Sequence, residues 1–207
     1  MEIHAPDHPI TGWKDTAKHL AIITAGVLIA LALEGVVSWA DHRLLVREAK
    51  ANLTEEIRSN RKELEGLFVN IERHRKELEH ADQVAQTLIE KGKVDGLVDL
   101  SWNFAELKNA AVTTGEITGA FGFMDYAEVR RFADAYDLQA QFLRTQERQL
   151  QDFQPILAFF RQIGETKPPS QASIEEWRAR INTQIAGLGY QEVMGRALVK
   201  RYDELLK

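Results

Sequence analysis

Residues 20–33 form an uninterrupted run of small and apolar residues, LAIITAGVLIALAL, without a charged side chain. Glu34 interrupts this run, and residues 35–40 (GVVSWA) extend it to about twenty residues. A helix rises about 1.5 Å per residue, so a helix of this length spans about 30 Å, the thickness of the hydrocarbon core of a bilayer. The sequence therefore predicts a transmembrane helix over residues 19–40, preceded by an N-terminal tail over residues 1–18.

The ends of this stretch carry the residues that anchor a helix at a membrane surface. Trp13 and Lys14 precede the run, and Trp39 closes it with Arg43 close behind. Aromatic and cationic side chains at both ends are typical of interfacial anchors. A buried core helix is the first alternative, but such a helix is rarely apolar on every face. A cleaved signal peptide is the second, although no helix breaker separates the run from the chain that follows.

Glu34 is the only ionisable residue within the apolar stretch 20–40, and such residues are costly in lipid. Gly26, Ala30 and Glu34 follow one another at intervals of four residues and so share one helix face. Another helix could approach closely on this face and bond the Glu34 carboxylate. The carboxylate could instead reach the nearby interface along its own side chain. A role in transport or proton transfer is the third alternative, which one span cannot support alone.

The orientation of the span stays open at this level. Lys14 and Lys18 precede the span, whereas Arg43, Arg47 and Lys50 follow it. This excess of one cation favours a cytoplasmic location for the large domain. Short N-terminal tails, however, more often stay inside while a long domain is exported, so the two arguments cancel.

A long helix is predicted over residues 41–91, where no proline occurs and apolar residues alternate at spacings of three and four. This alternation is typical of coiled coils and long helical bundles. The first seam position is occupied by Ile57, Leu64, Ile71, Leu78 and Ala85, and the second by Asn60, Leu67, His74, Ala81 and Leu88. Asn60 and His74 are the polar members of the second seam, where a polar side chain usually fixes register or partner contacts. His74 could alternatively act as a pH switch or bind a ligand.

Three further helices are predicted after residue 91. A shorter helix covers residues 101–119, a long helix over 126–164 begins after Asp125 and is kinked by Pro155, and a C-terminal helix covers 174–206. Residues 165–172 form the linker between the last two. Ser173 with Glu176 predicts a capping box for the C-terminal helix, and Gly187 and Gly189 are expected to loosen it. The predicted fold class is all-α: a transmembrane helix followed by an antiparallel, coiled-coil-like bundle over residues 41–207.

Few features of the sequence point to chemistry. The chain contains no cysteine, which excludes thiol nucleophiles and cysteine-ligated metals, and its net charge of −5 argues against nucleic-acid binding. The histidines lack the spacing of a zinc site, and no phosphate-binding loop or nucleophile elbow is present. We therefore predict no catalytic residue, no metal site, no cofactor and no enzymatic activity. Aromatic residues that could line a small-molecule pocket, or simply pack in the core, include Trp102, Phe104, Tyr126 and Tyr136.

Several segments resemble an uncharacterised family of short bacterial single-span membrane proteins. These are the opening MEIHAPDHPI, the span ending LIALALEG, the stretch HRLLVREAKANLTEEIRSNRKELE and the later TTGEITGAFGFMDYAEVRRFADAYDLQAQF. The resemblance extends to about residue 150 and implies a bacterial source. It also implies that Glu34 belongs to the family pattern. The resemblance brings no activity, cofactor or catalytic residue with it.

These observations lead to two functional hypotheses. The first is a membrane-tethered helical scaffold, adaptor or oligomerisation module in the bacterial inner membrane, whose partners are the lipid bilayer and another protein or a second copy. The second is a sensory domain that binds a small ligand within its bundle. A filled bundle with an exposed apolar stripe favours the scaffold, and an enclosed aromatic pocket favours the sensor.

Overall fold

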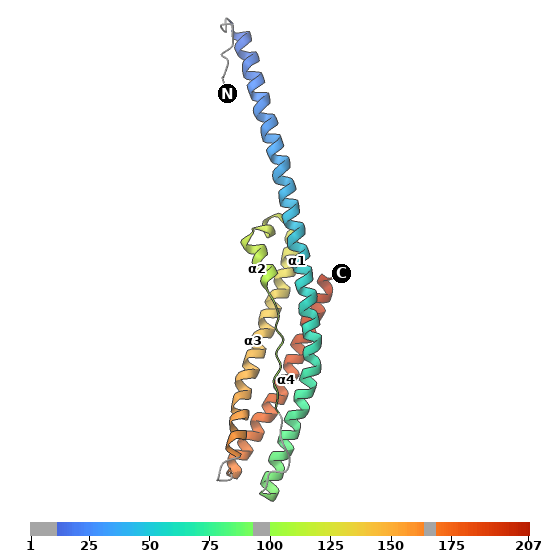
Figure 1. The fold of residues 1–207 in the computed structure, drawn as a ribbon, viewed down its shortest axis with the longest axis vertical. Helices are drawn as coiled ribbons and strands as arrows, with labels where there is room; N and C mark the ends of the chain where they lie inside the picture. The colour runs from blue at the N-terminus through green and yellow to red at the C-terminus, as the bar shows by residue number, and fades with distance from the viewer. Residues whose placement is uncertain (1–11, 93–99, 164–168) are drawn as a thin grey trace. The chain divides into compact units, whose positions relative to one another are not determined.

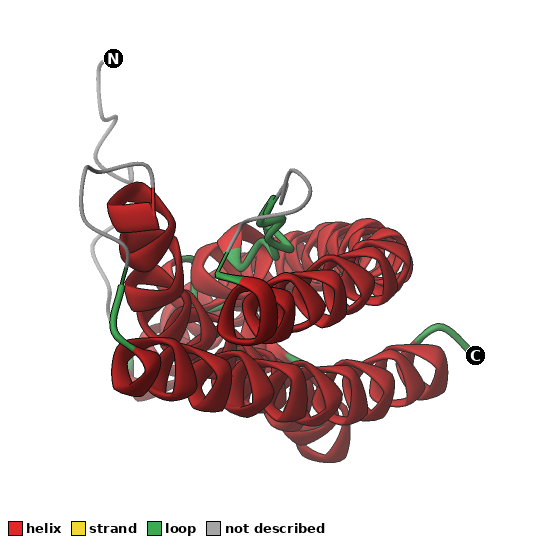
Figure 2. Cartoon of the chain, turned by 90° about the horizontal axis from the view of Figure 1, so that it is seen from below, coloured by secondary structure: helices red, strands yellow, loops and turns green. Residues whose placement is uncertain are grey.

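A computed structural model of the chain describes residues 12–92, 100–163 and 169–207. Its elements are α1 (Trp13–Lys91), α2 (Ala110–Ile117), the 3₁₀ helix η1 (Ala120–Phe123), α3 (Tyr126–Ile163) and α4 (Gln171–Leu205). The described residues contain helices and connecting segments but no strand (Figures 1 and 2). The predicted all-α class is therefore confirmed.

The chain divides into two compact units, Met1–Glu48 and Ala49–Lys207. In the first unit every described residue from Gly12 to Asp41 is exposed. This part of α1 is long and apolar enough to cross a membrane. The predicted boundary near residue 40 is not a helix boundary, because α1 continues without interruption to Lys91. The predicted tail also ends earlier than expected, since α1 begins at Trp13.

In the second unit, the two predicted seams of α1 form the core. All ten seam residues are buried, including the polar Asn60 and His74. Their burial confirms the spacing of three and four residues as a packing pattern. The positions on either side of the seams contact two different neighbours, which gives α1 two distinct flanks.

One flank of α1 faces α4 through a row of ion pairs. Arg61 Nε lies 2.6 Å from Asp203 Oδ1, and Arg75 Nη2 lies 3.1 Å from Glu192 Oε2. Further along, Arg178 of α4 pairs with Asp82 at 2.8 Å. Residue numbers rise along α1 as they fall along α4, so the two helices are antiparallel.

The third long helix, α3, runs parallel to α1 and antiparallel to α4. Glu128 pairs with Lys50 near the start of α3, and Tyr136 contacts Glu56 two turns further on. On its other side, Trp177 Nε1 of α4 donates a hydrogen bond of 3.0 Å to the carbonyl oxygen of Ile156. Three long helices thus enclose the core (Figure 1).

The predicted helix over residues 101–119 is wrong for most of its length. Residues 100–109 are not helical, and only Ala110–Ile117 form α2. The non-helical segment threads between α1 and α3 (Figure 1). Its direction is antiparallel to α1, because Ser101 bonds Glu77 whereas Ala111 bonds Glu56. The return pass of the bundle is therefore an extended chain, and side chains of the neighbouring helices bond its backbone groups in place of helical partners.

The last two helices differ from the sequence predictions in detail. Asp125 caps α3 as predicted, since its Oδ1 accepts from the amides of Ala127 and Glu128 at 2.9 and 3.1 Å. The N-cap of α4 is Ser170, whose Oγ accepts from the Ser173 amide at 3.2 Å, so the predicted start at Ser173 is wrong. The side-chain oxygen of the residue just before a helix can accept hydrogen bonds from the unpaired amides of the first turn. Ser170 occupies that position, whereas Ser173 lies within the helix. Of the predicted linker 165–172, residues 165–168 lie outside the described part of the chain.

α4 also continues through Gly187 and Gly189 to Leu205, so the expected loosening at these glycines is wrong. A Cβ atom at Gly187 would overlap the side-chain amide of Gln149 on α3. Glycine at this position allows close packing of the two helices, and that packing holds the helix together despite the low propensity of glycine.

Candidate functional site

Carboxylates along the second flank of α1 bind the extended segment. Glu56 accepts from the Ala111 amide at 2.9 Å, and Glu77 accepts from the Ser101 amide at 3.2 Å. From Glu56 to Glu77 the helix rises about 31 Å, and from Ser101 to Ala111 an extended chain spans about 33 Å. The two lengths match, so an extended conformation fits these two anchor points and a helix of ten residues would fall far short.

Asn60 pairs with the backbone of Lys108 at the middle of this contact. Its Oδ1 accepts from the Lys108 amide at 2.8 Å, and its Nδ2 donates to the Lys108 carbonyl oxygen at 2.7 Å. Gln139 of α3 donates to the same carbonyl at 2.9 Å. The hydroxyl of Tyr202 on α4 donates in turn to Gln139 Oε1. The predicted contact residue Asn60 therefore binds a peptide group of its own chain.

Gln146 of α3 repeats this arrangement one step along the extended segment. Its Oε1 accepts from the Ala105 amide at 2.9 Å, and its Nε2 donates to the Ala105 carbonyl oxygen at 3.1 Å. Both groups are buried, where an unpaired peptide group would cost about 1–3 kcal/mol. Asn60 and Gln146 thus supply the hydrogen bonds that let a non-helical backbone lie inside the bundle.

A buried carboxylate lies at the end of the segment near α2. The Tyr136 hydroxyl donates to Glu56 Oε1 at 2.7 Å. Burial and the neighbouring Glu56 carboxylate raise the pKa of Tyr136 well above its usual range. Tyr136 is therefore a neutral hydrogen-bond donor, and Glu56 is held by this hydroxyl and the Ala111 amide.

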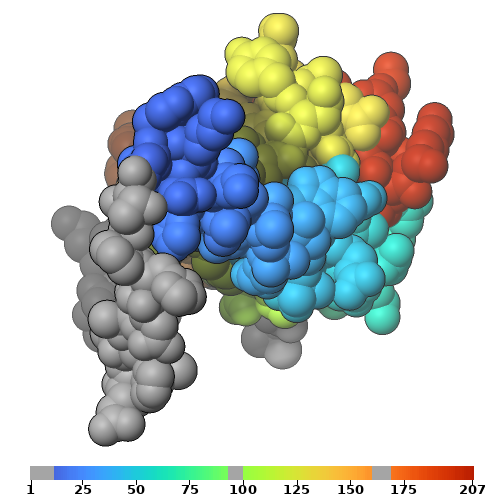
Figure 3. Space-filling model, turned by 90° about the horizontal axis from the view of Figure 1, so that it is seen from above, coloured from blue at the N-terminus to red at the C-terminus, as the bar shows by residue number. Residues whose placement is uncertain are grey.

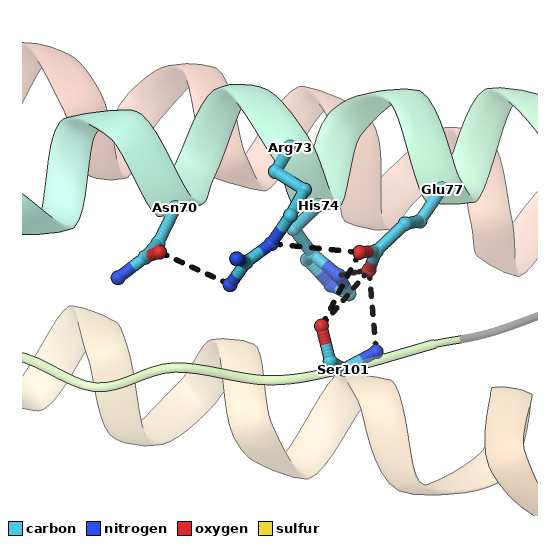
Figure 4. Close-up of polar contacts among 5 residues, drawn as sticks. All are labelled: Asn70, Arg73, His74, Glu77 and Ser101. Carbon is cyan, nitrogen blue, oxygen red and sulfur yellow. Dashed lines mark hydrogen bonds and ion pairs between the residues drawn. The ribbon is translucent and has the colours of Figure 1, made fainter.

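His74 is enclosed by aromatic rings at the opposite part of the extended segment. Its ring centroid lies 4.9 Å from Trp102 and 4.9 Å from Phe153, both nearly perpendicular. Its Nδ1 lies 3.3 Å from Glu77 Oε2, which also accepts from Ser101 (Figure 4). Burial lowers the pKa of His74, and Glu77 opposes this shift only in part. Because the carboxylate accepts, Nδ1 carries the proton of the neutral ring and Nε2 is left as an acceptor.

A cavity of about 10 Å³ adjoins His74. It is lined by Asn70, Ile71, His74, Trp102, Asn103, Leu188 and Gln191. Nε2 of His74, Nε1 of Trp102 and Oε1 of Gln191 have no hydrogen-bond partner within the described residues. A space of this size holds about one water molecule and nothing larger.

A second, larger hollow lies on the surface beside α1 and α2. It has a volume of about 420 Å³, is open to solvent, and is lined by Asn52, Glu55, Glu56, Ser59, Lys108, Ala110, Ala111 and Thr114. Its wide opening to solvent differs from the enclosed pockets that usually bind small molecules. Among the described residues, no three His, Asp or Glu side chains are grouped so that they could hold a metal ion.

The structure does not bring the four predicted pocket residues together. Trp102 and Phe104 lie on the extended segment, with ring centroids 5.8 Å apart. Tyr136 contacts Glu56 instead, and Tyr126 is 80% exposed at the start of α3. The prediction of one pocket lined by these residues is therefore wrong, because residues close together in the sequence contact different parts of the fold, Trp102 at His74 and Tyr136 at Glu56.

Four buried glutamines were not predicted from the sequence. Gln139 and Gln146 on α3, and Gln184 and Gln191 on α4, are all buried. Each pair is separated by seven residues, and Gln184 and Gln191 continue a buried row spaced by three and four residues along α4. This heptad spacing was the available signal, because glutamines at seam positions indicate polar contacts inside the bundle.

The predicted membrane contact residues lie in the first unit. Gly26, Ala30 and Glu34 are exposed on α1, and nothing lies within 4 Å of a Cβ atom placed on Gly26. Their proposed contact with another helix stays a prediction. No family model, curated protein or solved structure matches this chain, so the resemblance to a bacterial family also stays a prediction.

Proposed function

We propose that this protein is a non-enzymatic scaffold or adaptor, tethered to the bacterial inner membrane by the helix over residues 19–40. Its helical unit acts through contacts with another protein or with a second copy. The observation that supports this proposal best is an apolar stripe on the outer surface of the bundle. The described cavity beside His74 has room for about one water molecule and is too small for a ligand.

The outer stripe lies on the face of α4 that points away from the core. It consists of Ala186, Tyr190, Val193 and Ala197, all exposed and spaced by four, three and four residues. Tyr190 is 57% and Val193 65% exposed. Contiguous exposed apolar surface is typical of protein contact sites, and tyrosine is enriched in such sites.

Site-specific photo-crosslinking in native membranes tests this contact. A photoreactive residue in place of Tyr190 is expected to give a discrete cross-linked band, because that side chain lies in the stripe. Val69 on α1 is 72% exposed and makes the matched control, since it is equally apolar but has exposed polar neighbours. Equal cross-linking from both positions, or none from Tyr190, would contradict the proposal.

Paired reporter fusions after Lys207 identify the compartment in which the partner lies. A reporter active only outside the cytoplasm indicates a partner in the cell envelope. A reporter fluorescent only in the cytoplasm indicates a cytoplasmic partner recruited to the membrane. The charge count around the span does not distinguish these two arrangements.

The alternative function, a small-ligand sensor, is supported only by the open hollow beside α2. Its volume of about 420 Å³ is within the range of ligand sites. Lys108 and the two glutamates Glu55 and Glu56 would recognise a polar ligand there. Because this hollow is open to solvent, the sensor is the weaker of the two proposals.

A further inference from the structure

The corner between α2 and α3 exposes large apolar side chains. Ile117 ends α2 and is 81% exposed, and Tyr126 begins α3 and is 80% exposed. Phe123, at the end of η1, is 50% exposed. Gly119 has a φ of +72°, a conformation that glycine adopts without strain, and it allows the tight turn that brings these side chains to one corner.

This corner lies at the end of the second unit where the chain enters it. Lys50, the second residue of the unit, is paired with Glu128 of α3. Because α3 runs parallel to α1, Tyr126 lies further toward the entry end than Glu128 does. The residues around η1, drawn in yellow, are at the surface in the view from above (Figure 3).

The chain between this end and the apolar stretch is short. Only eight residues lie between Ala40, where the apolar stretch ends, and Ala49, where the second unit begins. These residues are helical, so the axial distance from Ala40 to Ala49 is about 13 Å. A bilayer that holds residues 19–40 is therefore tethered within reach of the α2–α3 corner, whichever side of the membrane the unit faces.

We propose that the α2–α3 corner is a lipid-contact surface, in which Ile117 and Tyr126 insert into the headgroup region of the bilayer that holds the chain. This inference rests on the proposed membrane tether. Tyrosine suits this depth because its ring is apolar and its hydroxyl stays hydrated. Asp125, beside Tyr126, bonds the first amides of α3, so its charge is satisfied locally.

The alternative occupants are water and protein. The side chains of Ile117 and Tyr126 are about four-fifths exposed to water. Moving them into lipid removes apolar surface from water, which lowers the free energy by about 25 cal/mol per Å² of surface buried. A membrane held nearby by the same chain needs no separate association step, because the short tether keeps its effective concentration high. Lipid is therefore favoured over a second protein.

Site-specific fluorescence on the full chain tests the inference directly. The chain contains no cysteine, so a single cysteine can carry an environment-sensitive dye at any chosen position. The variants are Ile117→Cys and Tyr126→Cys, with Val69→Cys as a matched control that is also apolar and exposed. A Leu28→Cys variant reports on the tether itself. Each is reconstituted into vesicles of phosphatidylethanolamine and phosphatidylglycerol, and its quenching by brominated lipids and by aqueous iodide is measured.

We expect dyes at positions 117 and 126 to be quenched by brominated lipid and shielded from iodide, with a blue-shifted emission. A dye at position 69 should be quenched by iodide alone. Iodide quenching at 117 and 126 equal to that at 69 would overturn the inference while leaving the tether intact. Shielding from both quenchers would identify a protein contact and would also overturn it. Absence of lipid quenching at position 28 would overturn the tether, and the lipid contact with it.

Discussion

At the scale of single residues, the polar core side chains bind peptide groups of the extended segment. Asn60 satisfies both backbone groups of Lys108, and Gln146 satisfies both groups of Ala105. A polar side chain at a seam position usually selects register or partner number in a coiled coil. Here side-chain amides at such positions form hydrogen bonds with a non-helical segment of backbone inside a helical bundle.

Asn60→Ala is expected to lower the free energy of unfolding by about 1–3 kcal/mol, because it removes a buried side chain and leaves the partly buried Lys108 amide unpaired. Urea unfolding of the full chain in non-ionic detergent, followed by circular dichroism, measures the change. Asn182→Ala is the matched control, since Asn182 is exposed on α4, and it should change the free energy by less than about 0.5 kcal/mol. Equal effects of the two substitutions would contradict the assigned role of Asn60.

His74 should make stability depend on pH. Its neighbours are Glu77 and Arg73 on α1, Ser101 and Trp102 on the extended segment, Phe153 on α3, and Gln191 on α4. Burial lowers its pKa in the folded state, so the unfolded chain binds the proton more readily. Stability from this group is therefore complete above its unfolded pKa of about 6.5 and is lost as the pH falls through the lowered folded value.

The pH dependence is measured as the difference between wild type and His74→Gln in urea unfolding at pH 7.5 and pH 5. Removing the buried titrating group should flatten the dependence. His80→Gln is the control, because His80 is exposed on the same helix, and it should keep the wild-type slope. A slope in His74→Gln as steep as in wild type would rule out His74 as its source.

At the scale of elements, the extended segment and α4 both depart from what their sequences favour locally. Residues 100–109 give up helical hydrogen bonds because α1 and α3 offer side-chain partners for their backbone. Helix α4 continues through Gly187 and Gly189 because Gly187 allows the side chain of Gln149 to approach closely. Tertiary contacts override weak local propensities in both cases.

Gly187 and Gly189 of α4 should respond to alanine in opposite directions. Gly187→Ala places a methyl group on the amide of Gln149 and is expected to destabilise the fold by about 1–3 kcal/mol. Gly189→Ala meets nothing within 4 Å and should stabilise the helix by about 0.5–1 kcal/mol. Thermal unfolding of the two variants checks this contrast. Stabilisation by both substitutions would contradict the close contact between α3 and α4.

At the scale of the whole molecule, the chain consists of two units with different surfaces. The described helix of Met1–Glu48 exposes its apolar residues and is long and apolar enough to cross a membrane, whereas Ala49–Lys207 has its own buried core. The core of the second unit is formed entirely by residues within that unit. Its folding should therefore not depend on the membrane.

A truncated chain of residues 49–207 is expected to be soluble without detergent, highly helical and cooperative in thermal unfolding. The full chain should instead sediment with membranes and resist extraction at alkaline pH, because about twenty apolar residues remain in lipid. Circular dichroism of the truncated chain and fractionation of both chains measure these properties. A truncated chain that aggregates or unfolds without cooperativity would show that the two units depend on each other.

Features that arise from periodic residue spacing could be predicted from the amino-acid sequence. Ten seam positions from Ile57 to Leu88, the cap at Asp125 and the apolar stretch before Glu34 were all visible in the spacing and type of neighbouring residues. Such features depend on contacts whose positions repeat along one helix. The sequence thereby indicated both the all-α class and the burial of Asn60 and His74.

The binding partners of the polar core residues and the path of residues 100–109 could be seen only in the folded structure. Residues 100–109 are extended because Glu77, Asn60 and Gln146, which lie 24–48 positions away in the chain, hold their backbone. For the same reason the aromatic residues expected to line one pocket lie in separate places, with Trp102 against His74 and Tyr136 against Glu56. Contacts between residues so far apart leave no local pattern in a sequence, and they have no favourable energy until the helices have packed.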